Sequence, residues 1–315
     1  MAQDKTTISN STSVALATKV KDYFQLIKFT LSFMVVFSTV VSYLIATEYR
    51  NLLDVLLLFF AGMCITGSAN TVNQITEKDT DALMKRTASR PVASGRMSVK
   101  EATAFAVITG IVGLLIMLLR FNWQSSLIGL LSLFLYGFIY TPLKKVNSIA
   151  VFVGAFPGAL PCLIGWVAAY YNSPILWTGG WIIFGIQFLW QFPHFWAIAW
   201  VAHQDYSKAG FKLLPSDKGP TKFTAVQTVM YSLLMVPVGL LPYVVKFIPD
   251  SEGVLHPMCG LVSLWIVLAC NLWMVFVSVR LYINMDVKSA RRVMFSSYFY
   301  LAVVLLALLA DKTHY

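Results

Sequence analysis

The chain alternates between long apolar runs and short polar segments from residue 24 almost to its end. A helix needs roughly 20 mostly apolar residues to cross a bilayer, and each run reaches or approaches that length. The runs lie at residues 24–46, 53–75, 101–119, 124–141, 149–171, 175–201, 223–246, 258–283 and 292–310. The pattern predicts an all-α polytopic membrane protein with nine transmembrane helices.

The polar segments between the runs are short, which predicts one membrane-embedded domain over residues 23–312. Residues 1–22 are polar and lack the apolar core of a signal peptide, so we expect a polar N-terminal tail there. Composition agrees with this organisation: of 315 residues, 58% are hydrophobic and 12% are charged. Such a composition is typical of multi-spanning membrane proteins and excludes a soluble globule.

Basic residues are distributed unevenly between the two sets of loops. Of the 24 lysines and arginines, 20 fall in the N-terminal segment and in the loops at 76–100, 142–148, 202–222 and 280–292. Cytoplasmic loops carry such an excess, so we expect the N-terminus inside and, after nine spans, the C-terminus outside. The net charge of +10 therefore reports topology and does not indicate a nucleic-acid partner.

Three polar residues at the inner end of the second run indicate a binding site. Asn73, Glu77 and Asp81 are spaced by four and share one face of a helix. A polar stripe that enters the bilayer is costly unless it serves a function. Arg86 and Arg90 follow at once, and carboxylates beside basic residues suit Mg²⁺ and a phosphate-bearing ligand. An ordinary basic loop would explain the arginines but not the stripe.

A second polar group lies in the sixth run. Gln187, Gln191 and His194 are spaced i, i+4, i+7 and share a face, next to Pro193, where we expect a kink. A structural histidine is the alternative interpretation of His194. The combination predicts the wall of a cavity.

Further polar residues belong to the same side of the membrane. Asp205 and Lys208 lie in the 202–222 loop, and Tyr140 and Lys144 end the fourth span. Singly, each is an ordinary interface residue. Together they predict a site at the cytoplasmic face, with Asp205 as an additional metal ligand and the lysines as phosphate partners.

These motifs resemble the UbiA-type intramembrane prenyltransferase superfamily and, within it, the heme branch. The superfamily motif Asn-x-x-x-Asp-x-x-x-Asp is similar to Asn73, Glu77 and Asp81, with glutamate in place of one aspartate. The heme branch is similar at Arg86-Thr87, Arg90-Pro91, Tyr140-Thr141, Trp190-Gln191-x-Pro193-His194, Asp205-Tyr206 and Phe295-x-x-Ser297. The likeness extends over residues from about 20 to 310.

The resemblance implies helices around a central cavity that opens near the cytoplasmic face of a bacterial inner membrane. It implies an Mg²⁺-dependent transfer of a farnesyl group from farnesyl diphosphate to a vinyl group of heme b, giving heme O and diphosphate. Heme b would be a substrate and not a fixed cofactor. A heme A synthase or a terminal oxidase assembly is a candidate partner.

The resemblance also implies roles for individual residues. The catalytic group would be Asn73, Glu77 and Asp81. The metal ligands would be Glu77 and Asp81, with Asp79 and Asp205 as alternatives. Substrates would contact Arg86, Arg90, Tyr140, Lys144, Gln191, His194, Asp205 and Lys208.

Two other functions remain open at this point. A prenyltransferase for an aromatic quinone precursor would need a fuller second aspartate motif, of which only Asp205 is clearly present. A transporter would place ionisable groups near mid-membrane in two inverted halves, whereas the acidic residues here crowd toward one face.

Overall fold

The computed structural model describes residues 18–48, 51–169, 177–216, 218–249 and 252–313. Nine helices within these ranges are long and apolar enough to span a membrane, which confirms the predicted fold class. They are α2 (Phe29–Ala46), α3 (Leu52–Thr76), α5 (Val99–Ile116) with η1 (Met117–Phe121), α6 (Trp123–Phe134) with η2 (Leu135–Tyr140) and α7 (Thr141–Leu143), α8 (Ala150–Ala169), α9 (Thr178–Val201), α11 (Lys222–Val244), α12 (Leu261–Asn284) and α13 (Val287–Ala310). The shorter elements are α4 (Lys78–Ala82), α10 (His203–Lys208) and the antiparallel strands β1 (Lys246–Pro249) and β2 (Leu255–Pro257).

Side-chain caps fix where several helices begin. The first backbone N–H groups of a helix lack partners within it, and a side-chain oxygen can accept from one of them. Asn51 accepts from the Leu53 amide at the start of α3, and Asn122 accepts from Ser125 at the start of α6. Asp286 accepts from the Ser289 amide and starts α13.

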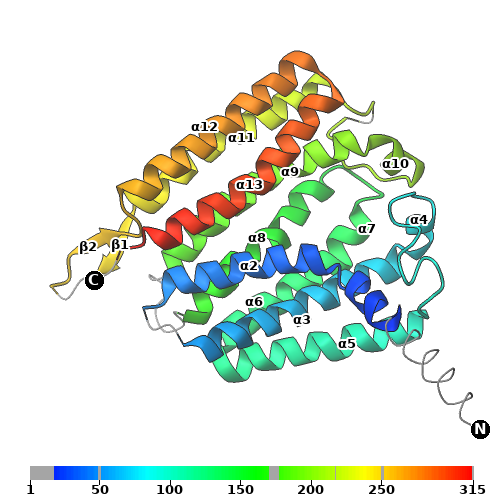
Figure 1. Cartoon of the computed structure of the whole chain (residues 1–315), viewed down its shortest axis with the longest axis horizontal. Coiled ribbons are helices and arrows are strands. Elements are labelled where there is room, and N and C mark those ends of the chain that lie inside the picture. Colours follow the sequence, from blue (N-terminus) through cyan, green and yellow to red (C-terminus); the bar gives the residue numbers. More distant parts are fainter. Residues whose placement is uncertain (1–17, 49–50, 170–176, 217, 250–251, 314–315) are drawn as a thin grey trace, which may run out of the picture.

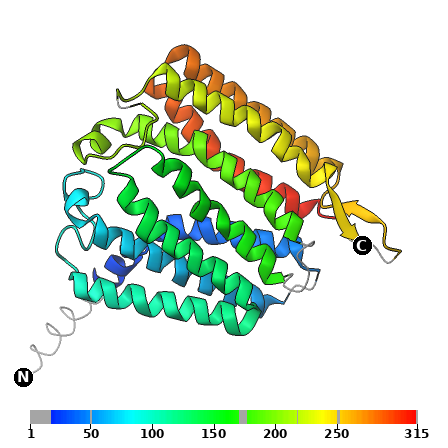
Figure 2. The same ribbon diagram turned by 180° about the vertical axis from the view of Figure 1, so that it is seen from behind.

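The helices form two packed groups that meet in the middle of the molecule (Figure 1). In one group α3 packs against α5 and α2, and α6 packs against α8. In the other, α11 and α13 pack against α9, and α12 packs against α11 and α13. Figure 2 shows the same grouping from behind, with the blue-to-cyan helices on one side and the yellow-to-red helices on the other. The contacts of α8 with α2 and α9, and of α13 with α2, join the groups.

The central helix α8 is the most buried of the spans, and small side chains allow its close contact with α2. Ser42 of α2 donates to the Cys162 carbonyl over 2.6 Å. A Cβ on Gly165 would lie 2.0 Å from the Thr39 carbonyl oxygen, so no larger residue fits at this crossing. The other central helix, α9, continues past Pro193 to Val201.

The polar elements gather at one end of the bundle. Figure 1 shows α4, α7 and α10 at the end opposite the β1–β2 hairpin. This end therefore carries three of the basic loops that the sequence assigns to one side of the membrane. The loops that follow α3, α7 and α9 are thus placed to build one site.

The helical segment before α2 is joined to the rest of the bundle by two ion pairs. Residues 18–26 are helical, and Asp22 is buried in an ion pair of 2.9 Å with Arg96 of the loop after α4. Lys19 pairs with Glu101 of α5 at 2.7 Å. The expected boundary at residue 22 stays a prediction, and residues 1–17 of the expected tail lie outside the described residues.

Candidate active site

The polar stripe at the end of α3 is buried. Asn73, Glu77 and Asp81 have exposed fractions of 1%, 3% and 0%. Asn73 lies in the last turn of α3, Glu77 is the junction between α3 and α4, and Asp81 lies in α4. The four-residue spacing places all three on one side despite the break at Glu77, because α4 continues with helical turns.

Glu77 is held by an ion pair and a hydrogen bond. The Lys144 ammonium lies 2.6 Å from Glu77 Oε1. Asn73 Nδ2 donates to Glu77 Oε2 at 2.9 Å and to Thr141 Oγ1 at 3.2 Å. Lys28 Nζ in turn donates to Asn73 Oδ1 at 2.6 Å. The start of α2, the end of α3 and the α7 turn thus meet around Asn73 and Glu77.

Asp81 is held by the loop that follows it. Arg90 Nη1 donates to both carboxylate oxygens of Asp81, at 2.7 and 2.6 Å. Thr87 Oγ1 donates to the Asp81 carbonyl at 2.8 Å. The Arg90 side chain is 16% exposed, so this is a largely desolvated ion pair. The chain between Asp81 and Arg90 therefore turns back, so that the Arg90 guanidinium contacts the Asp81 carboxylate.

Basic side chains outnumber acidic ones in this cluster, where Lys28, Arg90 and Lys144 lie beside two carboxylates. Burial lowers the pKa of the Lys28 ammonium well below its usual range, and the charges of Arg90 and Lys144 act in the same direction. Burial also lowers the pKa of Lys144, opposed by the Glu77 carboxylate. Lys28 has a positive φ of 49°, an uncommon conformation for a residue with a side chain. Electrostatically, the cluster suits an anionic ligand.

The loop at residues 202–222, which includes α10, contacts this cluster. Arg86 Nη2 donates to the Tyr206 hydroxyl at 3.1 Å. The Lys144 ammonium lies 4.9 Å from the centre of the Tyr140 ring and 5.3 Å from that of Phe211. The predicted convergence of the loops after α3, α7 and α9 is therefore present in the structure.

His194 forms a separate polar position between α9 and α13. It is buried, and its Nδ1 lies 2.8 Å from Ser297 Oγ. Its ring stacks on Trp190 with 4.6 Å between centroids and meets the edge of Tyr298 at 5.1 Å.

The two glutamines on the His194 face bind backbone. Gln187 Nε2 donates to the Gly158 carbonyl at 2.7 Å, and Gln191 Nε2 donates to the Ala155 carbonyl at 2.9 Å. Both carbonyls belong to α8, whose sequence contains Pro157 and Pro161. The glutamines therefore fasten α9 to α8, and a cavity wall along this face stays a prediction.

Three predicted residues make none of the ion pairs of this cluster. Asp79 and Lys208 are exposed, and Asp205 is half-buried. None of the three takes part in an ion pair within the described residues. Over the same ranges, no three His, Cys, Asp or Glu side chains group as a metal site. Of the acidic residues that the sequence predicted, Glu77 and Asp81 alone are buried together.

Sequence reasoning gave no role to four residues that the structure brings to these positions, although Thr141 and Ser297 stand in motifs of the resemblance. Lys28 and Thr141 contact Asn73, and Ser297 and Tyr298 contact His194. Lys28 stands just before an apolar run, where lysine is common as an interface residue, so its spacing gave no signal. Ser297 and Tyr298 lie inside a span whose pattern is otherwise apolar.

The donor set of the cluster fits a hard divalent cation. Glu77 and Asp81 offer carboxylate oxygens and Asn73 an amide oxygen, and Mg²⁺ is typically bound by one or two carboxylates together with substrate phosphates. Both carboxylates are buried. Their partners Lys144 and Arg90 are cations that could bind phosphate oxygens in place of the carboxylates.

A spanning helical bundle with a buried, cation-rich carboxylate cluster at one end defines a membrane-embedded enzyme for an anionic substrate. Residues 35–304 match the UbiA prenyltransferase family. The protoheme IX farnesyltransferase of Cytophaga hutchinsonii is 42% identical over 300 residues, covering 95% of this chain and 100% of that protein. The protoheme IX farnesyltransferase of Flavobacterium psychrophilum is 43% identical, covering 92% of this chain and 94% of that protein. The chain belongs to the UbiA prenyltransferase family.

Solved structures agree with this fold. A digeranylgeranylglyceryl phosphate synthase structure superimposes with a TM-score of 0.74 at 22% identity, covering 93% of this chain and 98% of that one. A UbiA homolog from Archaeoglobus fulgidus bound to GPP and Mg²⁺ superimposes with a TM-score of 0.64 at 15% identity, covering 91% and 99%. At these identities the likeness concerns the fold.

Proposed function

We propose that this protein transfers the farnesyl group of farnesyl diphosphate to a vinyl group of heme b, giving heme O and diphosphate. The observation that carries the proposal is the buried cluster of Asn73, Glu77 and Asp81 with its surplus of basic side chains. The identity of 42–43% to proteins named protoheme IX farnesyltransferase, over nearly whole chains, supports the choice of acceptor.

The diphosphate would bind at the carboxylate cluster. Glu77 and Asp81 would hold Mg²⁺, which when bound neutralises charge on the leaving diphosphate. Arg90 and Lys144 would exchange their carboxylate partners for phosphate oxygens, and Arg86 lies at the rim to assist. The exposure of Asp79, compared with the burial of Glu77 beside Asn73, favours Glu77 as the ligand.

The reaction balances without a redox partner. The bond between C1 of the farnesyl group and the diphosphate oxygen breaks, and its electron pair leaves with the diphosphate. The terminal carbon of the heme vinyl group supplies the electron pair for the new carbon–carbon bond. Water adds to the other vinyl carbon and releases a proton. Preorganised cations at the leaving oxygens stabilise the charge that develops there.

Heme would lie against the histidine position between α9 and α13. His194 would orient the macrocycle, with its ring fixed by Ser297 and Trp190. A neutral imidazole held through one nitrogen leaves the other free for an axial position. Gln191 shapes this wall through its bond to α8, and Tyr140 and Tyr206 border the diphosphate side.

We place the site at the cytoplasmic face of a bacterial inner membrane, with the N-terminus inside and the C-terminus outside. Support comes from the 20 of 24 basic residues in the N-terminal segment and the loops on that side, and from the bacterial sources of the relatives. A heme A synthase or a terminal oxidase assembly would be the acceptor of the product.

Mass spectrometry of the products tests the function directly. Purified protein in lipid would receive Mg²⁺, farnesyl diphosphate and either heme b or 4-hydroxybenzoate. We expect farnesylated, hydrated heme alone, and prenylation of only the benzoate would refute the proposal. Glu77→Gln and Asp79→Asn distinguish the two candidate ligands, because only the true ligand should abolish turnover. Asp54→Asn, which removes an ion pair with Arg120, controls for loss of a carboxylate elsewhere.

A further inference from the structure

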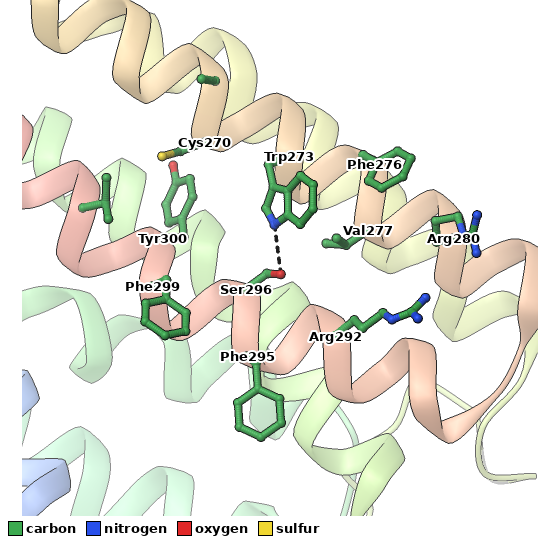
Figure 3. Close-up of a pocket in the computed structure, with 12 residues that line it drawn as sticks. Cys270, Trp273, Phe276, Val277, Arg280, Arg292, Phe295, Ser296, Phe299 and Tyr300 are labelled. Carbon is green, nitrogen blue, oxygen red and sulfur yellow. Dashed lines mark hydrogen bonds between the residues drawn. The ribbon is translucent and has the colours of Figure 1, made fainter.

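A groove separate from both polar positions runs between α12 and α13 (Figure 3). Its volume of about 840 Å³ lies within the range of small-molecule sites, roughly 300–1,000 Å³. Aromatic side chains form much of its walls, among them Trp273, Phe276, Phe295 and Phe299. The groove is therefore large and mostly apolar, and none of its twelve lining residues takes part in the proposed reaction.

The groove is a formed feature of the helix pair. Trp273 Nε1 of α12 donates to Ser296 Oγ of α13 over 3.0 Å, and this bond joins the helices across the groove (Figure 3). Val277 and Tyr300 beside it are buried and make its floor. The contact between α12 and α13 therefore sets the shape of the groove.

Two arginines give the groove a cationic end. Arg280 lies near the end of α12 and Arg292 near the start of α13, and both are exposed. Neither is ion-paired to another described residue. Asp286, the acidic residue in the turn between them, accepts the Ser289 amide as a helix cap. A phosphate would give both guanidinium groups a partner.

We propose that this groove binds an anionic phospholipid, with its phosphate between Arg280 and Arg292 and an acyl chain along the aromatic walls. The groove lies on α12 and α13 at the perimeter of the bundle, where lipid surrounds a spanning protein, and its arginines lie in a basic segment. Basic pockets between spanning helices bind lipid head groups in this way. Lipid fits better than heme, because Phe276 and Phe299 are 53% and 73% exposed. Sites for compact ligands enclose most of the ligand.

Lipid selectivity tests the proposal. The protein would be reconstituted with phosphatidylcholine and phosphatidylglycerol, extracted in neutral detergent, and its bound lipid quantified by native mass spectrometry. We expect bound phosphatidylglycerol in wild type. The double variant Arg280→Gln/Arg292→Gln should lower its affinity roughly 30-fold, from roughly fivefold per cation. Lys288→Gln/Arg291→Gln removes the same charge from residues outside the groove and should retain the selectivity.

A second variant tests the apolar part without changing charge. Ala269 is exposed in the groove, so Ala269→Phe fills it from an outward position and should reduce bound lipid of both head groups. If both double variants lost the same amount of bound phosphatidylglycerol, general surface charge would explain the binding and the proposal would be overturned. Unchanged lipid in Ala269→Phe, or displacement of phosphatidylglycerol by added heme b, would overturn it as well.

Discussion

The ion pair between Arg90 and Asp81 lets stability and catalysis be separated by mutation. Its two bonds, at 2.7 and 2.6 Å, join a fully buried carboxylate to a guanidinium that is 16% exposed. In the proposed mechanism Asp81 binds the metal, whereas Arg90 is its counter-ion in the ligand-free protein and afterwards one of several cations that bind phosphate. The same pair therefore has unequal partners, and removing one or the other should have different consequences.

The expected magnitudes follow from burial. Arg90→Gln strands a carboxylate with no exposure, and breaking a buried pair from one side costs about 3–5 kcal/mol. Asp81→Asn keeps an acceptor oxygen and leaves a guanidinium that reaches solvent, so we expect roughly 1–2 kcal/mol. For turnover the order of the two variants should reverse, so that Asp81→Asn loses more kcat than Arg90→Gln. Loss of the metal ligand in Asp81→Asn should lower kcat by about 10²–10³-fold, as for loss of one preorganised electrostatic group.

The assay combines thermal unfolding with heme O formation for the two single variants and the double variant. The double variant should be less destabilised than the sum of the singles, with a coupling of about 1–3 kcal/mol, because neither charge is then stranded. Arg90→Gln should be the less stable and the more active single variant. If both variants lost stability and activity equally, Asp81 would be a structural counter-ion and the metal role would be refuted.

Three further predictions concern other parts of the chain. Ser297→Ala should raise the KM for heme b and leave the KM for farnesyl diphosphate unchanged, because it frees the His194 ring, whereas equal changes in both constants would contradict a role for His194 in heme binding. Gly158→Ala should destabilise the protein by about 1–3 kcal/mol in thermal unfolding, since its Cβ would lie 2.0 Å from Gln191 Oε1, while Gly185→Ala, with only a 3.4 Å contact, is the tolerated control. Hydrogen bonds from the Ser289 backbone amide and side chain lower the pKa of the Asp286 carboxyl below 3.8. The contribution of Asp286 to the free energy of unfolding should therefore be present above pH 3.8 and lost as pH falls through the lowered pKa. Asp286→Ala should lower Tm at neutral pH and remove that acid-dependent step.

The sequence predicts the spans well because a bilayer admits few alternatives. Without water, every backbone polar group in the hydrocarbon region must bond within its own segment, so an apolar run of sufficient length is a helix. The spacing of Asn73, Glu77 and Asp81 likewise follows from helical geometry. The four-residue period extends through the junction at Glu77, where α3 ends and α4 begins, and the three residues remain together.

Contacts between distant segments are what the sequence could not supply. The bond from Lys28 to Asn73 joins residues 45 positions apart and depends on a positive φ at Lys28, which no propensity favours for lysine. The contact of Ser297 with His194 crosses 103 positions. Gln191 matched the pattern of a cavity-lining residue, yet its amide binds the Ala155 carbonyl. Residue spacing shows which side chains share a helical face, but tertiary packing decides which other segment that face contacts.

The cation partners explain how a carboxylate cluster can persist at a membrane interface and still accept a ligand. Unpaired, the buried Glu77 and Asp81 side chains would be costly, and Lys144 and Arg90 remove that cost in the ligand-free protein. Both cations come from segments outside α3, so they need not move with the carboxylates. When a metal and a phosphate enter together, the carboxylates can take the metal and the cations can take the phosphate, leaving every charge paired. The exchange requires both partners, because Mg²⁺ alone would compete with two internal cations, and this predicts that metal and diphosphate bind more tightly together than either does separately.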